Sequence, residues 1–218
     1  MVTADLFDAT TDTAARRIDF APGATLLRGF AAADAQALLS AVQAVIERAP
    51  FRHMITPGGY RMSMAITNCG AVGWVSDRSG YRYAALDPDS GASWPALPAL
   101  FGELAAAAAR RAGFADYCPD TCLINCYEPG ARLSLHQDKN EKDFAAPIVS
   151  VSLGLPAQFL FGGAQRKQRT LRLPLWHGDV VVWGGAARLA YHGVAALAAG
   201  SHPATGNRRI NLTFRRAL

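Results

Sequence analysis

The sequence predicts a mainly β protein of the α+β class whose C-terminal half forms a two-sheet jelly roll. From residue 120 onward, short apolar runs alternate with turn residues at a spacing typical of strands. No helical pattern separates these strands, which argues against a βαβ fold. Helical periodicity is confined to two segments in the first half of the chain.

Length and composition favour one domain. The chain has 218 residues, of which 50% are hydrophobic and 18% charged, with a formal net charge of +5. A chain of this length can bury one sizeable core. The modest positive charge permits a polyanionic partner without requiring one. We expect residues 1–17, which are polar and threonine-rich, to be a flexible N-terminus and residues 18–218 to form the domain.

We expect a cytoplasmic protein, because the sequence shows no recognisable targeting signal and its cysteines do not form a disulfide or cluster pattern. The acidic N-terminus lacks the basic and apolar regions of a secretory signal. No apolar run approaches the ~20 residues that span a bilayer, so no membrane partner is expected. The spacing of Cys118, Cys122 and Cys126 does not match the paired cysteines of structural zinc or iron–sulfur sites. We interpret the cysteines as buried free thiols in a reducing compartment.

The first half of the chain is predicted to hold a strand and two helices. Residues 24–30, ATLLRGF, form a short strand. Asp34 is a suitable N-cap for a helix with an apolar stripe, and Pro50 ends that helix. A second helix covers residues 97–112, and Gly113 stops it.

Residues 51–95 have a different composition, rich in glycine, aromatic residues, methionine and arginine without sustained periodicity. A Pro-Gly-Gly turn at 57–59 predicts short hairpins on either side. A segment of this composition is expected to lie over another part of the protein and not to form its hydrophobic core. Its large rings, Trp74, Tyr81 and Tyr83, alternate with arginines, as in surfaces that stack bases and follow phosphates. The alternative is an ordinary surface meander.

The C-terminal half supplies the strands of the jelly roll. They are predicted at residues 122–127, 148–155, 158–161, 171–175, 180–183, 189–192 and 209–215.

The last predicted strand has one polar and one apolar face. The polar face carries Arg209, Asn211, Thr213 and Arg215. A polar face this close to a core needs a partner, and a bound dicarboxylic acid would satisfy it. Asn125 and Tyr127, which share a face of an earlier strand, are suitable donors to the same acid.

A metal site is predicted in the run NCYEPGARLSLHQDKNE. His136 and Asp138 are separated by one residue, so on an extended backbone both side chains leave by the same face. His192 is well placed to supply a third ligand. A competing pattern at residues 177–179, His-Gly-Asp, is better explained as a tight turn entering the strand that follows.

Two histidines and one carboxylate leave three positions open on an octahedral metal, as Fe(II) oxygenases require for a co-substrate and oxygen. Zinc hydrolysis would also fit three protein ligands and a water. The downstream arginines favour iron, because a guanidinium can hold one end of a keto acid whose other end chelates iron.

The chain resembles the AlkB family of bacterial dioxygenases, which depend on Fe(II) and 2-oxoglutarate and repair alkylated nucleic acid. The likeness covers residues 18–216 and lies in four ordered motifs: PGGYRMSMAITNCG, CLINCYEPGARLSLHQDK, HGDVVVWGG and NLTFR. It implies a double-stranded β-helix (jelly roll) as catalytic core at 120–218, with N-terminal helices and a nucleotide-recognition lid at 51–95.

The resemblance also implies the reaction and its partners. Fe(II), 2-oxoglutarate and molecular oxygen would drive oxidative demethylation of bases such as 1-methyladenine and 3-methylcytosine. The expected substrate is single-stranded DNA, with RNA and double-stranded DNA as further candidates. The expected products are formaldehyde, succinate and carbon dioxide, and the enzyme is expected to be a monomer.

Carried over position by position, the resemblance assigns three sets of residues. Iron would be held by His136, Asp138 and His192. The 2-oxoglutarate set is Asn125, Tyr127, Arg209, Asn211, Thr213 and Arg215, with Arg209 alternatively ordering the metal site beside Asp138. The substrate set is Trp74, Tyr81, Arg82, Tyr83, Asn140 and Arg166, with Trp74 and His136 flanking the damaged base.

The sequence departs from the family pattern at two positions. Asn140 stands where the best-known relative has a carboxylate near the edge of the flipped base, which puts substrate preference in doubt. Ile66 replaces a methionine of the lid. Two other functions stay open: a dioxygenase of the same architecture acting on protein or a small molecule, and a non-catalytic binding protein.

Overall fold

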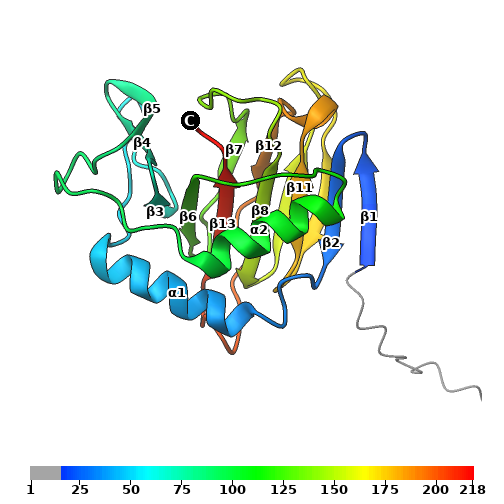
Figure 1. Cartoon of the computed structure of the whole chain (residues 1–218), viewed down its shortest axis with the longest axis horizontal. Coiled ribbons are helices and arrows are strands. Elements are labelled where there is room, and N and C mark those ends of the chain that lie inside the picture. Colours follow the sequence, from blue (N-terminus) through cyan, green and yellow to red (C-terminus); the bar gives the residue numbers. More distant parts are fainter. Residues whose placement is uncertain (1–15) are drawn as a thin grey trace, which may run out of the picture.

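The computed structural model describes residues 16–218 and is mainly antiparallel β with two α-helices (Figure 1). Residues 1–15, most of the N-terminus predicted to be flexible, lie outside the described range. The helices are α1 (Ala35–Arg48), α2 (Ala99–Arg111) and a 3-10 turn, η1 (Gly185–Ala187). The strands are β1 (Arg16–Ala21), β2 (Ala24–Arg28), β3 (Ala65–Gly70), β4 (Gly73–Asp77), β5 (Gly80–Ala84), β6 (Thr121–Tyr127), β7 (Leu133–His136), β8 (Ile148–Gly154), β9 (Ala157–Phe161), β10 (Leu171–Leu175), β11 (Val180–Trp183), β12 (His192–Val194) and β13 (Arg209–Arg215).

Two sheets form a jelly roll. The larger has seven strands in the order β1-β2-β11-β8-β13-β6-β3, and the smaller has four in the order β10-β9-β12-β7. Their neighbouring strands pair antiparallel. The hairpin β4–β5 forms its own small sheet beside the β3 edge (Figure 1). The predicted α+β, mainly β class and the jelly-roll architecture are confirmed.

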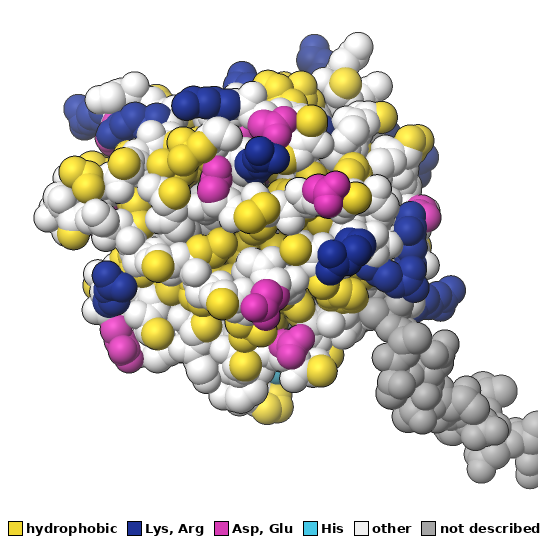
Figure 2. All heavy atoms as spheres, in the orientation of Figure 1, with side chains coloured by type: hydrophobic (Ala, Val, Ile, Leu, Met, Phe, Trp, Pro, Cys, Tyr) yellow, Lys and Arg dark blue, Asp and Glu magenta, His cyan; other side chains and the backbone are white. Residues whose placement is uncertain are grey.

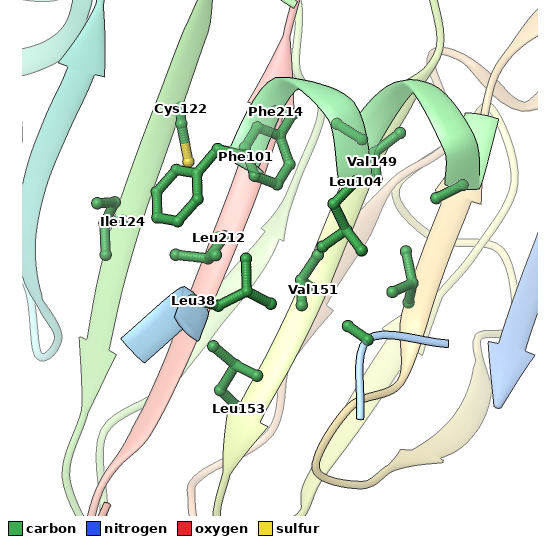
Figure 3. Packing of buried hydrophobic residues seen from close by; sticks show 14 of the residues in the cluster. Leu38, Phe101, Leu104, Cys122, Ile124, Val149, Val151, Leu153, Leu212 and Phe214 are labelled. Atoms are coloured by element: carbon green, nitrogen blue, oxygen red, sulfur yellow. The ribbon is translucent and has the colours of Figure 1, made fainter. Parts of the chain in front are cut away.

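Both helices cover one face of the larger sheet (Figure 1). Leu38 of α1 and Phe101 and Leu104 of α2 pack against Leu212 and Phe214 of β13 (Figure 3). Burying a side chain of this size stabilises the fold by roughly 1.5–3 kcal/mol. Because side chains alternate along a strand, this packing turns the polar positions of β13 toward the space between the two sheets.

A second apolar core lies between the sheets. Phe159 and Phe161 of β9 contact Trp183 of β11, with ring centroids 5.9 and 6.5 Å apart respectively. Tyr127 of β6 is fully buried in the same cluster. The polar side chains of β6, β7, β12 and β13 line a cavity beside this core.

Among the described residues, the face that carries the helices has no single-sign charge patch in the view of Figure 2. Basic and acidic side chains both occur on it, interspersed with apolar and neutral ones (Figure 2). No helix in residues 16–218 is long and apolar enough to cross a membrane.

Some boundaries differ from those predicted. β1 begins at Arg16, so residues 16 and 17 belong to a strand and not to the flexible N-terminus. The strand predicted at 189–192 instead starts at His192, because η1 and a loop occupy the positions before it. Helix α2 starts at Ala99, since Pro98 precedes its first turn. β3, within the segment predicted to be the lid, joins the larger sheet.

The cysteines are free thiols. Cys69, Cys122 and Cys126 are buried, as predicted. Cys118 is exposed, so the prediction of burial was wrong at that position; it lies in the loop between α2 and β6, outside the packed strands.

Candidate active site

Two histidines and one aspartate meet at the edge of the smaller sheet. His136 ends β7, His192 begins β12, and the two residues pair directly across these strands. Asp138 follows in the loop after β7. The three possible ligand atoms lie within 4.8 Å of one another. The predicted convergence of His192 on the His136–Asp138 pair is therefore confirmed.

The spacing of the donor atoms suits one metal ion. The carboxylate of Asp138 lies 3.5 Å from Nε2 of His136 and 3.8 Å from Nε2 of His192, both too long for good hydrogen bonds. Adjacent ligands of a metal with bonds of ~2.1 Å are about 3 Å apart. Small movements would bring all three side chains onto a shared ion.

Gly193 allows β12 to approach β7 closely enough to form this site. A Cβ at Gly193 would lie 2.6 Å from the carbonyl oxygen of Leu133. Any larger residue would push the two strands apart, and with them the two imidazoles. The glycine that follows His192 is thus part of the site's geometry.

Backbone hydrogen bonds orient both imidazoles. Nδ1 of His136 contacts the carbonyl oxygen of Ser134 at 3.0 Å, and Nδ1 of His192 contacts that of Ala190 at 3.0 Å. A carbonyl can only accept, so each Nδ1 carries the proton. Each Nε2 is left with a lone pair directed toward Asp138, as a metal ligand requires.

The charge states also favour a cation. Burial, followed by the nearby His136, lowers the pKa of His192 to about 3, so this imidazole stays neutral. Burial alone would raise the pKa of Asp138. Arg215 and the two histidines outweigh burial and hold this pKa well below its usual range. A neutral imidazole and an ionised carboxylate are the forms that bind divalent metals.

Arg215 orients Asp138. Its Nε and Nη2 both lie 2.8 Å from Oδ2 of that carboxylate. The sequence-based alternative, with Arg209 beside Asp138, is wrong: both arginines are on one face of β13, but they lie at opposite ends of the strand.

Arg209 places a buried guanidinium with unpaired hydrogen-bond donors in the cavity. It is 1% exposed and stacks over the ring of Tyr127 at 5.1 Å. Nη2 donates to Ser152 Oγ at 2.9 Å, whereas Nε and Nη1 have no hydrogen-bond partner within residues 16–218. Nη1 of Arg215 is likewise without a partner in that range. Buried guanidinium donors left unpaired are costly, and carboxylates would satisfy them.

Between the two arginines, β13 carries a polar ladder. Asn211 accepts from Asn125 Nδ2 at 3.2 Å and from Thr213 Oγ1 at 3.0 Å. Its own Nδ2 donates to Ser150 Oγ at 2.8 Å. The predicted acid-binding residues of β6 and β13 therefore share one wall.

The metal and acid groups open into one cavity of about 750 Å³. Trp74, Tyr81, Asn140 and Arg166 from the predicted substrate set also line it. The rings of Trp74 and Tyr81 stack with centroids 5.5 Å apart, and Trp74 Nε1 donates to Asn140 Oδ1 at 3.3 Å.

Two members of the predicted substrate set do not line the cavity. Arg82 points away and forms an ion pair with Asp77. Tyr83 donates its hydroxyl to Glu141. In the competing His-Gly-Asp pattern, His177 Nδ1 accepts from the amide of Gly154, confirming the predicted structural turn.

Four polar residues of this region were not predicted. Ser150 accepts from Asn211 and Ser152 accepts from Arg209, both on β13, and Glu141 and Arg188 form a buried ion pair. Alternating serines in the apolar run IVSVSLG could have revealed the first two.

A jelly roll with two histidines, one carboxylate and a buried anion pocket defines a non-haem iron oxygenase of the type that uses a keto acid. The donor chemistry supports this class, because the three possible metal ligands line the same cavity as guanidinium groups with unpaired donors.

Comparison with known proteins identifies the family. A family model for the 2OG-Fe(II) oxygenase superfamily matches residues 23–215. The alpha-ketoglutarate-dependent dioxygenase AlkB of Salmonella typhimurium (strain LT2) is 56% identical over 212 residues, 97% of this chain and 98% of that protein. AlkB of Escherichia coli (strain K12) is 53% identical with the same coverage. A solved structure of OsALKBH1 superposes with a TM-score of 0.79 at 28% identity, covering 92% of this chain and 100% of that chain.

The chain belongs to the 2OG-Fe(II) oxygenase superfamily and, within it, to the AlkB dioxygenases. It is an enzyme that depends on Fe(II), 2-oxoglutarate and molecular oxygen.

Proposed function

We propose that this enzyme oxidatively removes alkyl groups from base nitrogens of single-stranded DNA, with RNA and double-stranded DNA as further substrates. Bases such as 1-methyladenine and 3-methylcytosine are the proposed lesions. The observation that carries the proposal is the stacked pair Trp74 and Tyr81 in the same cavity as the metal triad. Aromatic faces of this kind hold a base removed from its stack.

More distant relatives support a nucleic-acid substrate. Proteins from Arabidopsis thaliana, Schizosaccharomyces pombe and Homo sapiens are named DNA N(6)-methyladenine demethylase ALKBH1C, tRNA demethylase abh1 and nucleic acid dioxygenase ALKBH1. A preference for single strands follows from energetics, because extruding a base from a duplex costs a few kcal/mol.

The proposed reaction assigns a task to each wall of the cavity. When bound, iron supplies the oxidation by which oxygen converts 2-oxoglutarate to succinate and carbon dioxide and hydroxylates the N-alkyl carbon. The hydroxylated group then leaves as an aldehyde, formaldehyde for a methyl lesion, and restores the base. His136, Asp138 and His192 would hold the metal. Arg209 would bind the far carboxylate of 2-oxoglutarate, and Arg215 would position Asp138 while offering its free Nη1 to the acid.

In this proposal residues 18–218 work as one monomeric domain. Residues 51–95 act as the substrate lid and 120–218 as the catalytic core. The hairpin β4–β5 is the part of the lid that reaches the base, because it carries Trp74 and Tyr81. Arg166, which also lines the cavity, would contact the nucleic-acid backbone.

The function is tested with a methylated single-stranded oligonucleotide, Fe(II), 2-oxoglutarate and air. We expect formaldehyde in equal amount to restored base, with matched duplex DNA and RNA oligonucleotides giving the relative rates. Succinate without loss of the methyl group would instead indicate a protein or small-molecule substrate. If neither formaldehyde nor succinate were formed, the proposal would be contradicted.

We expect Trp74→Ala to raise the KM for the methylated oligonucleotide about tenfold or more, because base–aromatic stacking contributes about 1–3 kcal/mol. The KM for 2-oxoglutarate should stay within twofold of the wild type. Steady-state kinetics on both substrates measures the two constants. Trp176→Ala is the matched control, since that indole is 55% exposed and does not line the cavity. If Trp74→Ala and Trp176→Ala changed the KM for the oligonucleotide equally, the assignment of Trp74 to the base-binding site would be contradicted.

A further inference from the structure

Buried charges beside the metal site form a network with Glu141 at its centre. Oε2 of Glu141 lies 3.1 Å from Arg188 Nη2, and Oε1 lies 3.5 Å from Arg215 Nε. The hydroxyl of Tyr83 donates to the same Oε1. The two arginines and the carboxylates of Asp138 and Glu141 are all buried, so two positive charges are matched by two negative ones.

This network supports a loop that has no regular structure. Residues 137–147 connect β7 to β8 and carry both Asp138 and Glu141 without strand pairing. Arg188 donates to the carbonyl oxygens of Asp138 at 2.8 Å and Ala146 at 3.0 Å. The position of Asp138 is therefore set by Arg188 on its backbone and by Arg215 on its carboxylate. Glu141 is the counterion that both arginines share.

The network also reaches the substrate hairpin. Hairpin β4–β5 shares no strand pairing with the larger sheets. Two side-chain hydrogen bonds join it to the loop at 137–147: Trp74 donates to Asn140 and Tyr83 donates to Glu141. Tyr83 and Tyr81 share one strand, so the Tyr83 hydroxyl fixes the strand that presents a stacking ring. Tyr83, Glu141, Arg215 and Asp138 thus form a continuous chain of contacts from hairpin to metal ligand.

We propose that Glu141 is a positioning residue: it holds Arg215 against Asp138 and anchors hairpin β4–β5 to the metal site through Tyr83. This inference takes its nucleic-acid substrate from the proposed function. The residue to which it assigns a role, Glu141, is not among the predicted metal-binding, 2-oxoglutarate-binding or substrate-binding residues. Without the Glu141 charge, Arg188 has no carboxylate partner in the described part of the chain and Arg215 keeps only Asp138, so the free Nη1 of Arg215 loses its fixed direction.

The test compares Glu141→Gln with Asp179→Asn. Asp179 is an equally buried carboxylate that pairs with Arg28 and does not line the cavity, so its loss measures the structural effect of removing such a charge. We expect Glu141→Gln to raise the KM for 2-oxoglutarate about tenfold, as for loss of one charged hydrogen-bond partner. It should also weaken the absorption band that 2-oxoglutarate gives on chelating Fe(II) without oxygen. Asp179→Asn should change neither.

Tyr83→Phe tests the hairpin contact on its own and leaves every buried charge paired, so it folds even if Glu141→Gln does not. We expect its KM for the methylated oligonucleotide to rise about fivefold or more, with the anaerobic absorption band unchanged. Equal thermal destabilisation of Glu141→Gln and Asp179→Asn with unaltered band and 2-oxoglutarate KM would overturn the first half of the proposal. An unaltered oligonucleotide KM in Tyr83→Phe would overturn the second.

These outcomes are distinct from failure of the proposed function. If the wild-type protein gave no anaerobic band with Fe(II) and 2-oxoglutarate, or released no formaldehyde, the proposed function itself would fail. A wild type that passes both assays, with variants that match it, contradicts the role of Glu141 alone.

Discussion

Replacing His136 by alanine should lower demethylation at least about a thousandfold. The imidazole is one of three ligands, and losing several kcal/mol of metal-based stabilisation corresponds to this factor. Its side chain is 33% exposed, so truncation leaves no large buried cavity and the protein should fold. Iron retained after anaerobic loading and desalting, measured together with formaldehyde release, tests the prediction.

The matched control is His177→Ala. This histidine belongs to the second His-x-Asp pattern of the chain, His177-Gly178-Asp179, and accepts a hydrogen bond from Gly154 at 2.9 Å. Its loss should cost about 1 kcal/mol of stability and leave iron content and turnover near the wild-type values. Retention of more than about a tenth of wild-type turnover in His136→Ala would show that the triad is misassigned.

Replacing Arg209 by methionine should have opposite effects on function and stability. Two charge-assisted hydrogen bonds contribute about 3 kcal/mol, so the KM for 2-oxoglutarate should rise more than about a hundredfold. The ligand-free protein should nevertheless become more stable by roughly 1 kcal/mol or more, because a buried guanidinium with unpaired donors is replaced by an apolar side chain. The rise in Tm that 2-oxoglutarate gives the wild type should disappear.

Arg28→Met distinguishes this effect from the general loss of an arginine. Arg28 pairs with Asp179, which is buried, so its removal strands a carboxylate and lowers the free energy of unfolding. The KM for 2-oxoglutarate should not change. A loss of stability in both variants, with no selective loss of 2-oxoglutarate binding in Arg209→Met, would contradict the proposed acid pocket.

The sequence predicted the features that depend on local periodicity. Alternation along residues 209–215 placed four polar side chains on one wall, and the His136–Asp138 spacing directed two ligands together. The same periodicity could not separate the tasks of Arg209 and Arg215, because both lie on one face. Only the loop after β7 brings Asp138 to the end of β13 where Arg215 lies.

The supporting contacts depend on chain segments that are distant in sequence. Arg188 meets Glu141 across 47 positions, and Asn211 meets Ser150 across 61. No periodicity in the sequence indicates either pair, because the two residues meet only when the strands of the jelly roll have paired. β1 and β12 escaped correct prediction for a similar reason: they are short or weakly alternating, and their partners in the sheet determine where they begin.

The two-sidedness of β13 limits how this enzyme can vary. One face seals the apolar layer beneath the helices, and the other binds ligands, so a one-residue insertion or deletion within the strand would exchange the two faces. Length changes there should yield protein that neither folds nor binds, whereas substitutions can alter one face alone. We therefore expect variation in this strand to be confined to replacements of side chains at constant length.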